Sequence, residues 1–444
     1  MSAYAKSAGA ATLKRLRQSR GWSLADAARM IIDTAHRLGQ PLDSTAASVQ
    51  RTVARWESPT APLLPSERYQ LLLVHTYART RDGQYHIGPG SDTAEALDAL
   101  AYLGESERRL TELRALLVRT ATDSGAGLLA LLGPATQDAL TAALADSDRV
   151  DERLLAAMNS AVADVNAHVG SVPFVRLQLL LAPVVESCRR LLAAGVPTPV
   201  APGLRSVAAR AYTLAGRMAF EMRDDSASRG LYAEATAAAG SLAPWQRAVV
   251  HMSHALVTLY STQGLNGART LVDAAVRDAR TGDSQTVRAR AHALQAEIAA
   301  RSGSERHAQA ALSLAAYDLD APRDDDPSAS SFTPGHLRGF EGVCELYVGD
   351  PVKAHDVFAG SAAALTAPRE QVQRAIVTTD QALARIRLDE PQAAAELLHD
   401  CVDAASSTGG RVVMQRLRQA RRELRPWRSE SFVADLDDHL LDAI

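Results

Sequence analysis

Aromatic residues and cysteines are both scarce in this chain of 444 residues. Phe, Trp and Tyr together make up 5%, and the three cysteines, Cys188, Cys344 and Cys401, stand far apart without a CxxC pair or a Cys/His cluster. The sequence therefore indicates neither a disulfide framework nor a zinc site, and a reducing, cytoplasmic environment is expected.

Long hydrophobic runs are missing as well. The N-terminal residues have no apolar core of the signal-peptide type. The most apolar stretch, residues 172–185, contains Arg176 and is too short to span a bilayer. No association with a membrane is therefore expected.

Sequence signatures of catalysis are also lacking. The chain has no Walker phosphate loop, no GxGxxG after a strand, no GxSxG and no HExxH. His251 and His254 have a spacing that metal sites use, but no third ligand is visible beside them, so they and His292 are interpreted as helix-surface or polar-pocket residues. The acidic run 323–327 is interpreted as a solvated loop. The sequence thus predicts neither an enzyme nor a bound cofactor or metal ion.

What the chain does contain is typical of a helical globular protein. Apolar residues make up 47% and charged residues 22%, and the length allows two or three domains. Alanine, the best helix former, is abundant, whereas β-branched residues are scattered singly. The expected fold class is therefore all-α.

Charge is unevenly distributed along the chain. Residues 1–81 contain 12 Lys/Arg and 5 Asp/Glu, whereas the remainder contains 36 Lys/Arg and 46 Asp/Glu. This pattern, a basic head on an acidic body, predicts that the head alone approaches a polyanion.

The basic head shows four amphipathic helical patterns. They cover residues 11–20, residues 24–39, a segment that begins between 43 and 48 and ends at Trp56, and residues 66–80. Ser23 is the expected N-cap of the second helix with Asp26 completing a capping box, and Gly39 and Pro41 are expected to end that helix. The glycine-rich segment 81–92 marks a predicted boundary, so residues 1–85 are assigned to one domain.

The C-terminal half repeats a pattern of small and bulky residues. A small residue is followed twelve positions later by another small one, then after four by a bulky one and after three by a small one; only Leu256 fits its small position poorly, and Ala255 stands beside it. Its five registers are Gly216/Ser228/Tyr232/Ala235, Leu256/Ala268/Val272/Ala275, Ala296/Ala308/Leu312/Ala315, Gly342/Ala354/Phe358/Ser361 and Ala382/Ala394/Leu398/Cys401. Small residues let antiparallel helices approach closely, so the pattern predicts stacked helical hairpins.

These repeats resemble tetratricopeptide-like repeats over roughly residues 203–406. The expected organisation is a helical connecting region at 93–202, TPR-like repeats at 203–425 and an acidic helix at 426–444. An irregular helical bundle is the alternative.

The stretch SVQRTVARWES, residues 48–58, carries the clearest functional signal. On one helix it would place Val49, Val53 and Trp56 in a single apolar stripe. The opposite face would present the polar residues Gln50, Arg51, Thr52 and Arg55. Gln can pair with adenine and Arg with guanine in the major groove. The alternative is an ordinary solvated face.

The head resembles the N-terminal domain of lambda-repressor-like helix-turn-helix regulators, the XRE family. The residues that carry the resemblance are Leu13, Leu16, Arg17, Gly21, Ser23, Ala28, Ile31, Val53, Trp56 and Glu57. The resemblance implies that Gln50, Arg51 and Arg55 touch base edges. It also assigns phosphate contacts to Lys14, Arg17 and Arg20.

The head departs from that family pattern at three places. Leu24 replaces the usual Gln, Ser58-Pro59 replaces a glycine-containing turn, and the link between the second and third helices is far longer than about four residues.

Together these features predict a cytoplasmic transcription regulator that binds double-stranded DNA through its head. By analogy with repeat-bearing regulators, the body is expected to form a homodimer, to sense a peptide or small-molecule effector, or both. The alternative is a protein-interaction scaffold whose helix-turn-helix head does not bind DNA.

Overall fold

The structure, a computed structural model, describes residues 3–38, 42, 44–80, 83–123, 128–262, 264–321, 325–329, 331–367, 370–408 and 410–442. These residues form 21 α-helices and, apart from two isolated bridges, no β-structure, which confirms the all-α prediction. None of these helices combines the length and the hydrophobicity that a bilayer crossing requires.

The chain folds into two compact units, Met1–Arg149 and Val150–Ile444. The division differs from the predicted boundary at 81–92 and falls inside the predicted connecting region. The reason is long-range packing, because helices that follow the glycine-rich segment share one hydrophobic core with the helices before it. We call the two units the head unit and the repeat unit.

The head unit contains seven α-helices. They are α1 (Ala3–Ser19), α2 (Leu24–Arg37), α3 (Ala46–Trp56), α4 (Glu67–Ala78), α5 (Asp92–Leu103), α6 (Glu107–Asp123) and α7 (Pro134–Ala145). Ser23 caps α2 and forms the expected capping box with Asp26. The helix ends at Arg37, and Gly39 and Pro41, which were expected to end it, lie outside the described residues.

Close packing of α1 on α5 explains why the head extends past residue 92. A side chain at Gly9 would bring its Cβ to within 2.7 Å of the Ala99 carbonyl oxygen, so only glycine allows this approach. Because α5 and α6 bury their leucines in the same core as α2, α3 and α4, residues 1–85 do not form a separate domain.

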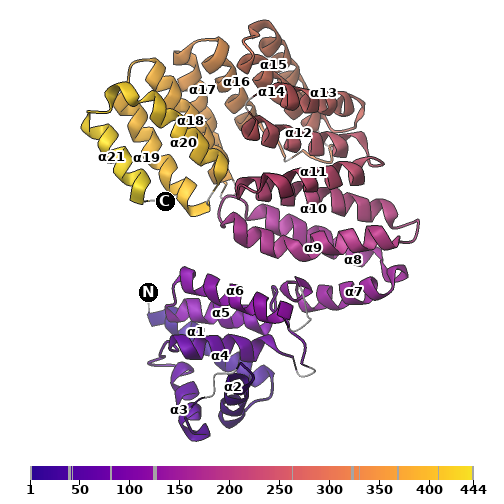
Figure 1. Ribbon diagram of the computed structural model, residues 1–444, viewed down its shortest axis with the longest axis vertical. Helices are drawn as coiled ribbons and strands as arrows, with labels where there is room; N and C mark the ends of the chain where they lie inside the picture. The colour runs from indigo at the N-terminus through magenta and orange to yellow at the C-terminus, as the bar shows by residue number, and fades with distance from the viewer. Residues whose placement is uncertain are drawn as a thin grey trace. The chain divides into compact units, whose positions relative to one another are not determined.

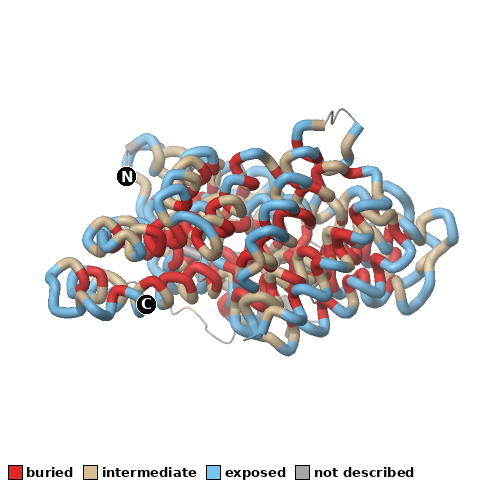
Figure 2. The backbone as a smooth tube through the Cα atoms, turned by 90° about the horizontal axis from the view of Figure 1, so that it is seen from above, coloured by how far each residue is buried: buried red, intermediate tan, exposed pale blue. Residues whose placement is uncertain are grey.

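The repeat unit is a series of paired helices (Figure 1). Its helices are α8 (Glu152–Ala167), α9 (Phe174–Ala194), α10 (Ala201–Glu221), α11 (Asp225–Ala239), α12 (Pro244–Ser261), α13 (Asn266–Thr281), α14 (Gln285–Arg301), α15 (Glu305–Asp320), α16 (Pro334–Val348), α17 (Pro351–Ala364), α18 (Gln371–Arg387), α19 (Pro391–Thr408), α20 (Arg411–Glu423) and α21 (Ser431–Asp442). Each of the five registers predicted from sequence falls on one hairpin, from α10/α11 to α18/α19. Buried stretches lie along the helices, while their outer turns are exposed (Figure 2).

The small residues of the pattern lie where the two helices of a hairpin touch. A Cβ on Gly342 would come within 2.6 Å of the Phe358 ring, and one on Gly216 would come within 3.0 Å of Tyr232. The Ser228 hydroxyl in the first hairpin donates to the Gly216 carbonyl at 2.8 Å. The spacing therefore predicted the contact between facing helices correctly.

The long segment between α15 and α16 was interpreted as a solvated loop, but part of it is hydrogen-bonded to the start of α14. The Asp326 carboxylate accepts hydrogen bonds from the Ser284 hydroxyl at 2.6 Å and the Thr286 amide at 2.7 Å. These bonds attach the segment to the start of α14. Of the acidic run interpreted as a loop, Arg323 and Asp324 lie outside the described residues.

The C-terminal part of the repeat unit returns to its first hairpin. The amides of Arg411 and Val412 at the start of α20 donate to one oxygen of Glu221 on α10, at 2.7 and 3.2 Å. An ion pair between Arg411 and Asp225 lies beside them. The helix α20 therefore crosses from the last repeats back to α10.

Phe358→Ala tests the hairpin contact. Phe358 is fully buried, so its truncation leaves a cavity and should cost the hairpin about 3–5 kcal/mol. Amide hydrogen exchange in α16 and α17 of the full chain should then accelerate at least about 100-fold. Truncation of the half-exposed Leu314 on α15 is the control and should change exchange little. Unchanged exchange in the Phe358 variant would contradict the assigned packing.

The lowered pKa of His75 makes the stability of the head unit depend on pH. Burial lowers its pKa to about 4, and the side chain is only 3% exposed. Between pH 6.5 and 4 the unfolded chain therefore binds more protons than the folded one, so stability falls as pH decreases through this window. Lowering the pH from 7.5 to 5 should cost the wild type about 2 kcal/mol more than His75→Gln.

Urea unfolding followed by tryptophan fluorescence measures this difference, provided that the fluorescence comes from the head unit alone. Trp22 and Trp56 lie in the head unit, so both proteins are compared with Trp245 and Trp427 replaced by Phe. An equal pH dependence of the two proteins would show that His75 does not titrate as its burial requires.

Candidate nucleic-acid interface

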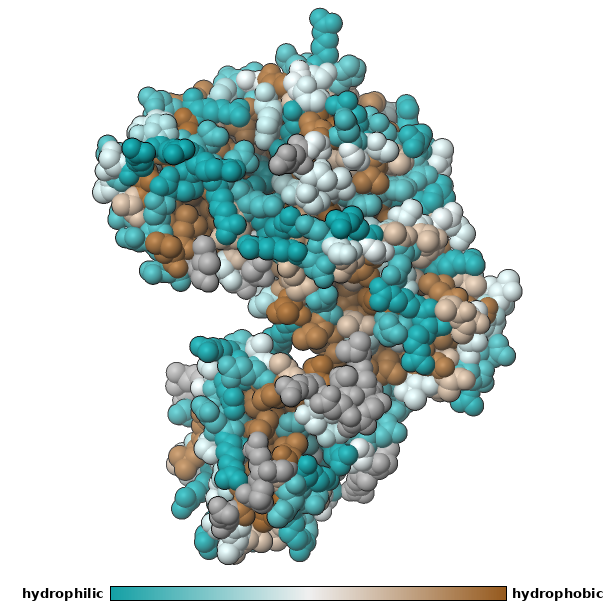
Figure 3. Space-filling model, viewed as in Figure 1, coloured by the Kyte–Doolittle hydropathy of each residue, from teal (hydrophilic) through white to brown (hydrophobic). Residues whose placement is uncertain are grey.

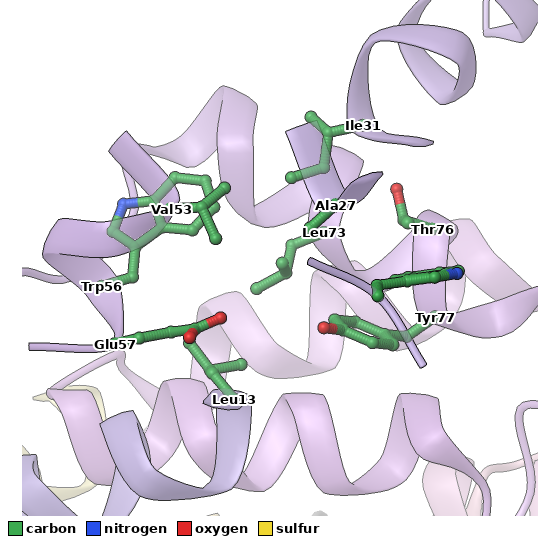
Figure 4. Close-up of a pocket in the computed structure, with 10 residues that line it drawn as sticks. Leu13, Ala27, Ile31, Val53, Trp56, Glu57, Leu73, Thr76 and Tyr77 are labelled. Carbon is green, nitrogen blue, oxygen red and sulfur yellow. The ribbon is translucent and has the colours of Figure 1, made fainter. Parts of the chain in front are cut away.

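The apolar stripe of α3 anchors this helix in the head unit, as its spacing predicts. Val49, Val53 and Trp56 are 0%, 4% and 3% exposed. The Trp56 indole meets the Tyr69 ring edge-on, with ring centroids 5.3 Å apart. Figure 4 shows Val53 and Trp56 facing the same interior as Ile31 of α2. Burial of this stripe fixes which face of α3 points outward.

A buried ion pair reinforces the C-terminal end of α3. The Arg17 guanidinium on α1 donates to both carboxylate oxygens of Glu57, the residue after Trp56, at 2.8 to 3.1 Å. It also donates to the Trp22 carbonyl at 2.8 Å. The hydrogen bond to Glu57 raises the pKa of Arg17, and the two side chains are only 10% and 7% exposed. A forked contact of this kind fixes α1 and α3 in one geometry.

The outward face of α3 carries cations without partners. Arg51 and Arg55 are exposed, and neither forms an ion pair or a side-chain hydrogen bond with any described residue. Gln50 is half-buried beside them, and the Thr52 hydroxyl donates to the Ser48 carbonyl at 3.1 Å. The helix thus presents two free guanidinium groups and one amide, while the Thr52 hydroxyl is engaged by its own helix.

The three residues expected at phosphates have different environments. Lys14 is exposed and has no partner among the described residues. Arg17 is engaged by Glu57, and Arg20 donates to Asp92 at 2.6 Å and to the carbonyls of Tyr77 and Arg79. Both guanidinium groups are thus engaged within the head unit, and of the three residues Lys14 alone has no side-chain partner among the described residues.

The departures from the helix-turn-helix pattern have structural explanations. Leu24, in place of a polar residue, packs against the hydrophobic core of the head unit. Much of the apparently long link is helix, because α2 continues to Arg37 and α3 begins at Ala46. The Ser58 hydroxyl accepts from the Ala61 amide at 3.3 Å, which supports the turn without a glycine.

The net charge of the head unit is small, but its basic residues are concentrated in the first four helices. Residues 1–149 contain 17 Lys/Arg and 16 Asp/Glu, because the basic excess of the first four helices is followed by acidic residues in the next three. A polyanion is therefore attracted locally, near the unpaired cations of α3, and not by the unit as a whole.

The interior behind α3 is not a ligand site. The space between Leu13, Val53, Trp56 and Leu73 holds about 10 Å³, which is about the volume one water molecule needs. The chemistry of this region is consequently that of its outer surface. Among the described residues, no group of three or more His, Cys, Asp or Glu side chains could hold a metal ion.

Comparison with known proteins adds no family to this description. The chain matches no protein-family model, no curated protein and no solved structure.

Glu57→Gln tests whether the ion pair positions α3. Removing one charge of a buried pair leaves Arg17 uncompensated, so the head unit should lose about 3 kcal/mol of unfolding free energy. The control Asp33→Asn breaks a pair with Arg37 that is much more exposed and should cost less than about 0.5 kcal/mol. Urea unfolding followed by Trp22 and Trp56 fluorescence measures both. Equal losses would show that the Glu57 pair has no special role.

Proposed function

We propose that the head unit binds double-stranded DNA and that the protein is a transcription regulator. The observation that carries the proposal is the outer face of α3, where Gln50, Arg51 and Arg55 are free while the inner face is fixed by Trp56 and Glu57. Arginine and glutamine on an anchored helix have the side-chain chemistry that reads base edges in the major groove.

Phosphate contacts would come from Lys14 and from backbone groups rather than from Arg17 or Arg20. The Ser23 N-cap and the Thr45 N-cap place the amino ends of α2 and α3 at the surface, where amide groups can also bind phosphate. Such contacts orient the helix on the duplex but carry no sequence information.

We further propose that two copies bind inverted half-sites one helical turn apart and that the repeat unit senses an effector. The rival function is a scaffold whose repeats bind a protein partner along their inner face. The crossing of α20 back to α10 counts against it, because this helix occupies part of the inner surface that an extended partner would need.

Arg51→Ala separates base reading from non-specific attraction. On a duplex that carries the preferred sequence, the variant should lose about 1–3 kcal/mol of binding free energy, while its affinity for unrelated DNA stays nearly unchanged. Fluorescence anisotropy with the intact chain measures both affinities. An unchanged preference for the site would rule out the assignment of Arg51 to a base.

Lys14→Ala provides the contrasting case. Loss of one phosphate contact should weaken binding to all duplexes alike and reduce the slope of log affinity against log salt by about 0.9. Arg108→Ala on α6 removes the same charge from an exposed position that is ion-paired with Glu112, and serves as the control. If Lys14→Ala and Arg108→Ala behave identically, Lys14 does not contact DNA.

A further inference from the structure

The repeat unit contains a cavity of about 370 Å³ that is open to solvent and lies within the size range of small-molecule sites. Its lining comes from the inner helices of successive hairpins, α10, α12, α14, α16 and α18, together with α20. Val412 on α20 packs against Phe220 of α10 and Val257 of α12, so the last repeats complete the wall begun by the first. The cavity therefore depends on the packing of α20 against α10 and α12.

Two arginines line this cavity, and they differ in their surroundings: the charge of Arg217 opposes the rise that burial causes in the pKa of Glu221, whereas Arg290 has no carboxylate partner among the described residues. Arg217 of α10 and Arg290 of α14 both line it, and neither forms an ion pair or a side-chain hydrogen bond with a described residue. Burial of Arg290 and the like charge of Arg217 beside it lower the pKa of Arg290 to about 10. Both arginines are half-buried, and two like charges placed close together are costly where anions do not balance both of them.

The same unit pairs its other buried arginines. Arg416 forms an ion pair with Asp380, and Arg301 binds the Glu297 carboxylate at 2.8 Å. The carboxylate of Glu221, which also lines the cavity, is already engaged by the amides of α20. Among the described arginines that line the cavity, Arg290 thus differs from Arg416, which has a carboxylate partner.

The remainder of the lining is mixed, with polar and charged side chains such as Glu297, Glu370 and Asp380 beside an apolar portion. Aromatic and aliphatic side chains contribute from α16 and α18 and from the segment before α16; they include Phe332, Phe340, Val343, Ile376 and Val377. A ligand that contacts the apolar portion and the two arginines together would offer an apolar body to the former and a negative charge to the latter. The face of the repeat unit drawn in Figure 3 is mostly hydrophilic with small hydrophobic patches.

We propose that this cavity binds a small organic carboxylate whose apolar body lies against Phe332 and Phe340 and whose carboxylate lies between Arg217 and Arg290. A guanidinium fork matches a carboxylate in two-point geometry. The proposal specifies the effector of the regulator proposed above, but the binding step itself does not depend on DNA.

Calorimetric titration of the full chain with decanoate, and separately with decan-1-ol, tests the charge requirement. Decanoate should bind with one site per chain and at least about tenfold more tightly than the alcohol of equal length. In Arg290→Met this preference should disappear, while Arg290→Lys should keep part of it. The control Arg306→Met removes an exposed charge on α15 and should keep all of it. Equal binding of acid and alcohol to the wild type, or no binding of decanoate, overturns the proposal.

Thermal unfolding without ligand gives a second test that needs no choice of probe. A ligand-binding arginine without a partner is an uncompensated charge, so Arg290→Met should raise the melting temperature of the unliganded protein by a few degrees. A melting temperature lowered by the substitution would assign Arg290 a structural role and contradict the proposal.

These outcomes remain distinct from those for DNA binding. Loss of decanoate binding in Arg290→Met with unchanged affinity for DNA in the absence of decanoate would support the cavity site alone. Failure of the intact chain to bind any duplex would remove the regulator but leave the carboxylate site to be judged by calorimetry.

Discussion

The contact between Arg17 and the Trp56-Glu57 pair is the constraint on which the functional surface depends. The indole ends the apolar stripe of α3, and the carboxylate next to it accepts three hydrogen bonds from Arg17 of α1. Because both ends of this contact are buried, α3 cannot rotate without exposing Trp56 or leaving a charge unpaired. The orientation of Gln50 and Arg51 is therefore a consequence of packing and not of their own contacts.

The arginines named above fall into two groups, those with carboxylate partners and those without. Both proposals depend on the second group. Arg17, Arg301 and Arg416 are buried with carboxylate partners and hold elements together. Arg51 and Arg55 on the surface, like Arg217 and Arg290 in the cavity, have no partner among the described residues. The two proposals assign external anions to the second group, DNA for the α3 arginines and a small carboxylate for the cavity arginines.

Local patterns in the sequence predicted the elements correctly, whereas contacts between distant residues limited the rest. The period of Val49, Val53 and Trp56 identified the buried face of α3, and the repeat spacing identified five hairpins. The extent of the head unit depended on the approach of α1 to α5, which no local pattern encodes. Arg17 resembled a phosphate-binding residue because its partner, Glu57, lies 40 residues away. Arg217 and Arg290 gave no sequence signal, since only the return of α20 makes their surroundings a cavity.

Selection of binding sites from random duplex DNA by the intact chain tests the central claim most directly. An anchored α3 with free glutamine and arginine side chains predicts enrichment of one sequence motif containing a guanine, arranged as inverted half-sites. A pool that shows no sequence preference after repeated selection, or that retains no DNA, would contradict the account.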